Sequence, residues 1–174
     1  MRKVTFGGAN SLDNYLARPD HAVDWLLWGK EAAAVMRDYW KTIDTILMGR
    51  KTYEVALRNS QGKEGYPGVK TYVFSRTLQP RDHPGVTVVA DKVEETVAAL
   101  RAKSGKDIWL FGGASLFRSL LDARLVDTVE VAVMPVLLGG GIPLLPLPAK
   151  QAKLRLIGHS ASKAGIVSLE YAMT

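Results

Sequence analysis

Apolar residues along the chain follow two recurring patterns, short continuous runs and longer stretches with helical spacing. The short runs are rich in valine, isoleucine and phenylalanine, and each is followed by turn-forming residues, which is typical of buried strands. We therefore expect strands at Lys3–Gly7, Thr42–Met48, Thr71–Phe74, Val86–Val89, Ile108–Phe111 and Thr128–Met134.

Between these runs, apolar side chains recur every three or four residues, which indicates amphipathic helices. The clearest helix is Lys92–Lys103, because Val93, Val97 and Leu100 share one face and Gly105 follows as a terminator. We expect further helices at about Asp24–Lys41, at Lys51–Leu57 and directly after Gly113.

The C-terminal part of the chain has strand patterns without intervening helices. Leu154–Ser160 and Ile166–Met173 alternate between apolar and polar residues, and Ala164-Gly165 between them predicts a closing antiparallel hairpin. Strands that alternate with helices and then continue alone predict an α/β sheet that is mostly parallel with antiparallel edges. At 174 residues we expect one domain, residues 1–174.

Composition narrows the class of protein. Hydrophobic residues make up 47% of the chain and charged residues 23%, as in ordinary soluble globular proteins. No apolar run reaches the roughly 18 residues of a membrane span, and the N-terminus lacks the apolar core of a signal peptide. The absence of cysteine excludes disulfides, thiolate catalysis and zinc–sulfur sites, so we expect a cytoplasmic protein with no membrane partner.

The net charge of +6 permits an anionic partner but does not indicate nucleic acid. Basic residues are scattered, and no lysine- or arginine-rich block occurs, so a small phosphorylated ligand accounts for the excess equally well. His21, His83 and His159 are too dispersed for a metal site or a catalytic triad, so we expect no metal.

One stretch, Ile108–Phe117, combines an apolar strand, two glycines and a helix. Gly112 and Gly113 leave the free amides at the start of the helix uncovered, and these amides with the helix dipole favour a phosphate or diphosphate. A tight turn that only lets helix and sheet pack closely is the alternative. Gly49 stands between a strand and a helix in the same way.

Ligands of open α/β sheets bind beyond the carboxyl ends of the parallel strands. Arg76, just after a predicted strand, suits a ribose phosphate because a guanidinium binds phosphate in a bidentate fork. The chain lacks both the Gly-x-Gly-x-x-Gly pattern and the P-loop pattern, so a dinucleotide site here belongs to another fold.

Four motifs carry a family resemblance. Met48–Glu54 resembles the Met-Gly-Arg-x-Thr-Trp/Tyr-Glu signature of dihydrofolate reductases and their relatives. Ser11–Ala17 resembles a stretch of the reductase domain of bifunctional riboflavin-biosynthesis deaminase-reductases, the RibD C-terminal domain family. Gly112-Gly113-Ala114 and Leu125–Thr128 with Pro135–Leu144 resemble further motifs of that domain, in the same order.

The resemblance implies a dihydrofolate reductase-like fold, which is a three-layer α/β/α arrangement with a mixed, mostly parallel sheet and a C-terminal antiparallel hairpin. It also implies an NADPH-dependent reductase that acts on a small heterocyclic or imine/carbonyl substrate, similar to 5-amino-6-(5-phosphoribosylamino)uracil reductase, and a homodimer. The residues implied to bind the cofactor are Ala9, Asn10, Gly49, Arg50, Lys51, Thr52, Ser75, Arg76, Gly112, Gly113, Ala114 and Ser115.

Asp13 and Glu31 are the candidate catalytic residues by the same resemblance, with Asp24 in reserve for Glu31. Two departures from the family patterns bear on them. Asn14 stands where riboflavin-type relatives have glycine, and Ala132 stands where folate reductases have a supporting threonine. Ala132 weakens the case for folate reduction, so a true dihydrofolate reductase is the alternative, not the first choice. A catalytically silent nucleotide-binding module is the alternative of another class.

Overall fold

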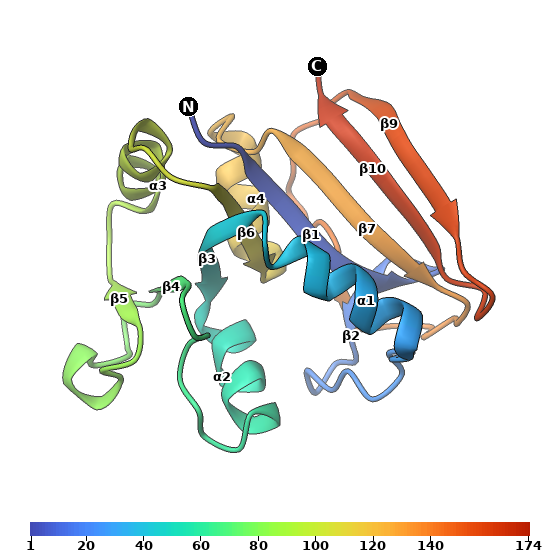
Figure 1. Ribbon diagram of the computed structural model, residues 1–174, viewed down its shortest axis with the longest axis horizontal. Helices are drawn as coiled ribbons and strands as arrows, with labels where there is room; N and C mark the ends of the chain where they lie inside the picture. The colour runs from blue at the N-terminus through green and yellow to red at the C-terminus, as the bar shows by residue number, and fades with distance from the viewer.

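The computed structural model describes residues 1–174, except for the side chain of Glu31. Its centre is an eight-stranded sheet with the strand order β5-β4-β3-β6-β1-β7-β10-β9 (Figure 1). A second pair, β2 (Tyr15–Ala17) and β8 (Ile142–Pro143), is antiparallel and separate from this sheet. The strands of the main sheet are β1 Val4–Ser11, β3 Ile43–Gly49, β4 Lys70–Phe74, β5 Thr87–Val89, β6 Asp107–Gly112, β7 Thr128–Met134, β9 Leu154–Ala161 and β10 Val167–Met173.

The sheet is mixed and mostly parallel, as predicted. The strands from β5 to β7 in the sheet order all pair in parallel. β10 is antiparallel to both β7 and β9, which confirms the C-terminal hairpin. The opposite edge, β5, is parallel to its neighbour, so antiparallel pairing in the main sheet is confined to one edge.

Strand β1 continues to Ser11, past the glycines at which the sequence predicted its end. The indole of Trp109 lies over this part of β1 and donates a hydrogen bond of 2.9 Å to the carbonyl of Gly7. A Cβ atom at Gly7 would lie 2.7 Å from that indole nitrogen. Gly7 therefore lets the Trp109 side chain of β6 approach the backbone of β1 closely. It does not end the strand.

Helices cover both faces of the sheet, which gives the predicted three layers. α1 (Lys30–Tyr39) and α2 (Arg50–Asn59) lie on one face, and α3 (Val93–Ala102) and α4 (Ala114–Asp122) lie on the other (Figure 1). Among the described residues, no helix has the length and apolar content needed to cross a membrane.

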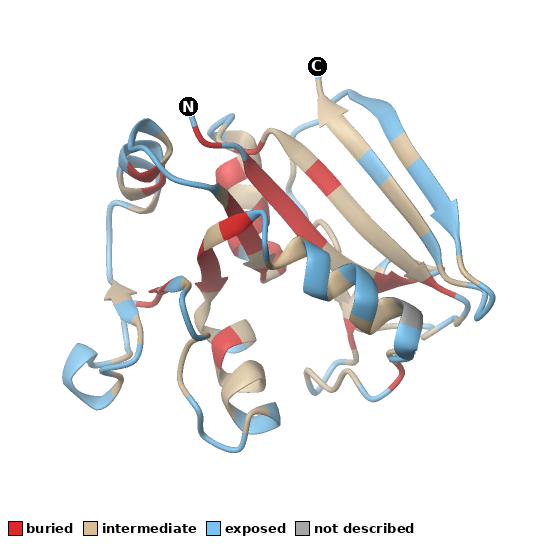
Figure 2. Ribbon diagram, in the orientation of Figure 1, coloured by how far each residue is buried: buried red, intermediate tan, exposed pale blue. Residues whose placement is uncertain are grey.

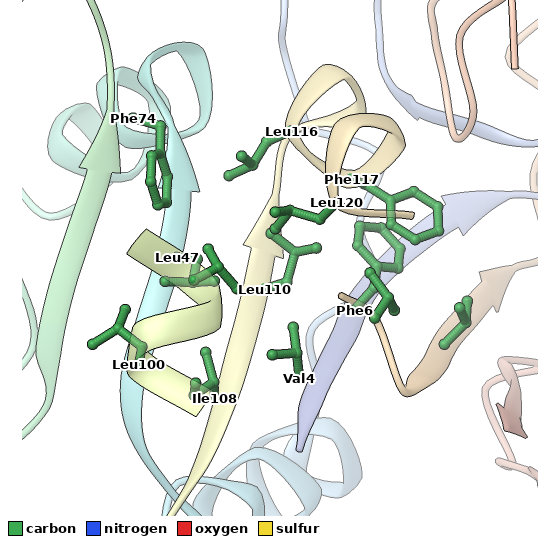
Figure 3. Packing of buried hydrophobic residues seen from close by; sticks show 13 residues of the cluster. Val4, Phe6, Leu47, Phe74, Leu100, Ile108, Leu110, Leu116, Phe117 and Leu120 are labelled. Carbon is green, nitrogen blue, oxygen red and sulfur yellow. The ribbon is translucent and has the colours of Figure 1, made fainter. Parts of the chain in front are cut away.

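The core on the α3/α4 face is the larger of two hydrophobic clusters. It is formed by alternate residues of β1, β3 and β6 against α4, and the rings of Phe6 and Phe117 stack at 4.0 Å (Figure 3). The second cluster, under α1 and α2, contains Trp109 with Tyr39 and Trp40 edge-on to it. Buried residues are concentrated in β1, β3, β6 and α4, whereas β9 is exposed along most of its length (Figure 2).

Helix α1 is shorter than the predicted Asp24–Lys41, because it begins at Lys30. Gly29 has an extended backbone, which interrupts the helical pattern, and the segment before it is irregular. Trp25 of this irregular segment is buried, whereas Trp28 is 69% exposed. Apolar periodicity continued across Gly29 although the helix does not.

Candidate cofactor and substrate site

The predicted ligand-binding residues gather at one edge of the sheet. β4, β3, β6 and β1 are neighbours in this order, and their carboxyl ends lead into Ser75-Arg76, α2, α4 and the loop after Ser11 respectively. With about 4.8 Å between adjacent strands, the edge from β4 to β1 spans about 14 Å, a length suited to an extended dinucleotide. The structure brings these residues together, while their roles as ligands stay predictions.

The two strand–glycine–helix junctions are in direct contact. Met48 of β3 pairs with Gly112 of β6, and both helices begin immediately beyond this pair. A Cβ atom at Gly49 would lie 3.4 Å from the amide nitrogen of Gly113, and one at Gly113 would lie 2.9 Å from Thr52 Oγ1. These glycines therefore let the first turns of α2 and α4 approach side by side, with the Thr52 hydroxyl beside them. The peptide between Gly112 and Gly113 is cis.

Neither helix start has a side-chain cap. Gly49 and Gly113 are the N-cap residues, and neither first turn contains an acidic residue. The first amides of a helix have no partner within the helix, and the dipole places partial positive charge there. Two such starts in contact form a positively polarised surface of backbone amides that suits a phosphate group.

Arg50 and Lys51 add positive charge to the first turn of α2, and both approach Glu54. The Arg50 guanidinium lies 2.6 Å from the Glu54 carboxylate and the Lys51 ammonium lies 3.6 Å from it. Partial burial opposes ionisation of Glu54, but the Arg50 hydrogen bond and both cations lower the pKa of this carboxyl. Glu54 thus pairs with both basic side chains of the first turn of α2.

Ser75 and Arg76 form a turn at the end of β4. The buried Ser75 hydroxyl accepts hydrogen bonds from the amides of Thr77 and Leu78 at 3.2 and 3.1 Å. The Ser75 side chain therefore stabilises the turn, and this role explains a serine at this position without a bond to a ligand. Arg76 is exposed and has no ion-pair partner among the described side chains, so its guanidinium is free to bind an anion.

At the end of β1, Ala9 and Asn10 face opposite sides of the sheet. Ala9 shares its face with Trp109, whereas Asn10 is fully buried and donates hydrogen bonds to Ser11 O and Asn14 Oδ1. The side chain of Asn10 therefore holds its own loop, and only its backbone faces the site edge. Asn14 has φ of 65°, the left-handed conformation that glycine adopts most easily, so this departure from the riboflavin-type pattern keeps the backbone shape.

Asp13 joins two loops. One carboxylate oxygen accepts hydrogen bonds from Ser11 Oγ at 2.6 Å and Leu138 N at 3.1 Å, and the other accepts one from Gly139 N at 2.7 Å. The Ser11 bond first, and then the two amides, lower the pKa of Asp13 to about 2. Asp13 is therefore a carboxylate at neutral pH, with its oxygens directed at the 135–141 loop.

The other predicted catalytic residue, Glu31, lies in α1, but its side chain is outside the described part of the structure. Asp24, the reserve candidate, is exposed and pairs with Arg18 at 2.7 Å. Ala132 lies in β7 beside Ala9 of β1. Sequence reasoning did not single out Glu130, two residues earlier on the same face; its only signal was a charged residue inside an otherwise apolar strand.

Comparison with known proteins assigns the family. The family described as RibD C-terminal domain matches residues 2–168, so the chain belongs to it. The uncharacterised protein YyaP of Bacillus subtilis is 32% identical over 181 aligned positions, which cover 98% of this chain and 95% of YyaP.

Solved structures agree on the fold. A protein of Shewanella sp. PV-4 named for riboflavin biosynthesis aligns over 100% of this chain and 99% of its own, with a TM-score of 0.78 and 25% identity. The Thermotoga maritima diaminohydroxyphosphoribosylaminopyrimidine deaminase/5-amino-6-(5-phosphoribosylamino)uracil reductase aligns over 99% of this chain and 57% of its own, at a TM-score of 0.73 and 16% identity. Dihydrofolate reductase from Enterococcus faecalis, complexed with NADP(H) and RAB-propyl, aligns over 99% of this chain and 96% of its own, with a TM-score of 0.68 and 17% identity. The fold is that of dihydrofolate reductase, and family and fold together indicate an oxidoreductase of the riboflavin-reductase type.

Proposed function

We propose that the protein is an NADPH-dependent reductase that transfers a hydride to a small heterocyclic or imine/carbonyl substrate. The observation that carries this proposal is the contact between two uncapped helix starts, at Gly49 and Gly113. A cofactor with a diphosphate would satisfy the free amides there, and the exposed Arg76 on the neighbouring strand end would bind a phosphate on the adenosine ribose.

The residues at this edge fit NADPH. Gly49 to Thr52 and Gly112 to Ser115 would hold phosphate groups through backbone amides and hydroxyls, and Ala9 would lie beside the nicotinamide. NADPH, when bound, supplies the hydride. What the chain itself must provide is placement of the substrate, exclusion of water and one proton.

We assign Asp13 a positioning role within this function. Its carboxylate holds the 135–141 loop against the end of β1, next to the proposed nicotinamide site. A group with a pKa of about 2 carries almost no proton at neutral pH, so Asp13 is a poor proton donor there.

Binding of NADPH tests the proposal directly. We expect NADPH to quench intrinsic tryptophan fluorescence and to raise the melting temperature, by an amount that grows as the logarithm of its concentration over Kd. NADH, which lacks the ribose phosphate, serves as the matched control. If millimolar NADPH changes neither signal, the proposal is wrong.

Assays of NADPH oxidation then distinguish the two proposed reductase functions from a catalytically silent module. NADPH oxidation that requires 5-amino-6-(5-phosphoribosylamino)uracil or another heterocycle supports the proposed reductase, and oxidation that requires dihydrofolate supports a folate reductase. Tight binding with no turnover across such a panel indicates a module that has kept only the cofactor site. The homodimer expected from the family resemblance stays a prediction, which sedimentation velocity at several protein concentrations will test.

A further inference from the structure

Three residues from three neighbouring strands form one row across the sheet. Gly7 of β1 is in register with Glu130 of β7, and Glu130 is in register with Glu170 of β10. Residues in register point their side chains to the same face, and in this row it is the face covered by α1. The next row toward the carboxyl ends on this face contains Ala9 and Ala132. Glu130 is therefore one pleat below the residues proposed to lie beside the nicotinamide.

The titratable groups that act on or near Glu130 in the described part of the structure are acids and a phenol. Glu170 is in register with it on β10. Burial first, and then the charges of Glu130 and of Asp107 in β6, raise the pKa of the Tyr39 phenol of α1, so Tyr39 lies near both carboxyl groups. The Tyr39 hydroxyl is buried without a hydrogen-bond partner. Among the side chains that the structure describes, neither glutamate has an ion-pair or hydrogen-bond partner.

This environment favours a protonated Glu130. Burial first, and then the neighbouring Glu170 carboxylate, raise the pKa of Glu130 to about 7. Glu170 itself is exposed and lies over Gly158 of β9, where a Cβ atom would come within 2.8 Å of its Oε2. The row thus runs from a half-buried acid beside β1 to an exposed acid in contact with solvent.

The stability of the fold does not explain why Glu130 and Glu170 stand opposite each other in this row. Like charges directly opposite each other on adjacent strands are destabilising, and a half-buried carboxyl without a partner costs more than an apolar residue in the same strand. The flanking positions of β7 on the other face, Val129 and Val131, show the apolar residues that the strand uses for packing. A chemical role for the acid accounts for its position better than packing does.

From this placement we infer that Glu130 is the acid that supplies the proton in the reduction, an inference that rests on the proposed function. The substrate carbon gains the hydride, with its two electrons, from the cofactor. The Glu130 carboxyl breaks its O–H bond and gives the proton to the nitrogen or oxygen bonded to that carbon. Glu130 is left as a carboxylate and regains a proton from water on the Glu170 side, so each turnover adds two hydrogens to one double bond.

The test compares Glu130→Gln with Glu95→Gln, a control at an exposed glutamate of α3. NADPH affinity, measured by fluorescence, should remain unchanged in both variants. With dihydrofolate and 5-amino-6-(5-phosphoribosylamino)uracil as the probes, kcat of Glu130→Gln should fall roughly 100-fold or more, the usual contribution of a positioned acid. Glu170→Gln should keep kcat in mildly acidic solution and shift the alkaline fall of kcat to lower pH, because it removes the neighbouring charge that keeps Glu130 protonated.

A readout without turnover checks the same pair. In protein labelled with carboxyl-¹³C glutamate, the Glu130 resonance, assigned by its loss in Glu130→Gln, should titrate near pH 7 and move to lower pH in Glu170→Gln. The inference is overturned by any of three results: unchanged kcat in Glu130→Gln, failure of the wild type to reduce either probe, or an ordinary Glu130 titration. If the wild type still binds NADPH in these cases, the proposed cofactor site stands. Failure of the wild type to bind NADPH would overturn the proposed function and the catalytic role together, even if Glu130 still titrated near pH 7.

Discussion

At the scale of single residues, Asp13 shows how a motif aspartate can act through structure. Its carboxylate accepts three hydrogen bonds, one from Ser11 within its own loop and two that tie this loop to the 135–141 loop. In Asp13→Asn, an amide NH₂ replaces one acceptor oxygen and faces a donor, so at least one bond is lost. We expect faster limited proteolysis within residues 135–141 and a lower kcat, with NADPH affinity nearly unchanged.

The pH dependence of this clamp provides the check. Because the pKa of Asp13 is lowered from 3.8 to about 2, its stabilising contribution is complete above the unfolded value and is lost as the pH falls through about 2. Proteolysis of the wild-type loop should therefore not change between mildly acidic and mildly alkaline solution. A Ser60→Ala variant, altered in a distant loop, is the control for general loosening. Normal proteolysis and kcat in Asp13→Asn would contradict the positioning role.

Arg76 allows a second test at the residue scale. Its guanidinium is exposed at the end of β4, on the same edge as the helix starts. If it binds the phosphate on the adenosine ribose, Arg76→Ala should weaken NADPH binding roughly 10- to 100-fold and leave NADH binding unchanged, since a charge-assisted hydrogen bond contributes about 1.5–3 kcal/mol. Isothermal titration with both cofactors measures this, and Arg81→Ala, at an exposed position of the following 3-10 turn Pro80–Asp82, is a control of equal charge change. An equal loss of affinity for NADPH and NADH would show that Arg76 does not select for the ribose phosphate.

At the scale of elements, the contact between α2 and α4 is the feature that makes the site. Gly113 has φ of −94°, which other residues adopt without strain, so only space requires glycine there. Gly113→Ala would place a methyl group 2.9 Å from Thr52 Oγ1 and push the two helix starts apart. We expect NADPH affinity to fall at least roughly 10-fold, as amides move out of line with the diphosphate.

The matched control for that variant is Gly29→Ala, at the residue before α1. A Cβ atom at Gly29 meets no other atom within 4 Å and its φ is −130°, so the same chemical change is made in open space without backbone strain. Its NADPH affinity should equal that of the wild type. A Gly113→Ala protein that keeps wild-type affinity would show that the close contact of the two helix starts is not needed for the cofactor.

Elements with a clear period were predictable, and elements shaped by contacts were not. The strand Thr128–Met134 has the predicted bounds, and α3 differs from its predicted range by one residue at each end, because their apolar patterns are regular and bounded by turn residues. Strand β1 was predicted too short because the use of Gly7 depends on Trp109, more than a hundred residues away in the chain. Helix α1 was predicted too long because apolar residues recur on both sides of Gly29 for different reasons, burial of Trp25 before it and helical packing after it.

At the scale of the whole molecule, the chain order of motifs could be converted into a site because the topology is parallel. Residues that follow β3, β4 and β6 must meet at one edge when these strands are parallel neighbours. The sequence could not show that Asp13 faces another loop, since its partners lie about 125 positions further along the chain. Nor could it show that Glu130 and Glu170 are opposite each other, because strand register depends on the folded sheet.

The Glu130–Glu170 pair also predicts how global stability changes with pH. The folded state raises the pKa of Glu130 from 4.5 to about 7, so between these values it binds more protons than the unfolded chain. Stability linked to this group is therefore fully present below the unfolded value and is lost as the pH rises through about 7. Because the side chain is only partly shielded from solvent, we expect a loss of about 1–2 kcal/mol, smaller than the full shift would give. Glu130→Gln should abolish this loss, so that its melting temperature relative to the wild type rises between mildly acidic and mildly alkaline solution, as calorimetry would measure. Glu95→Gln, at an exposed position, should follow the wild type; the same pH slope in Glu130→Gln would show that another group is responsible.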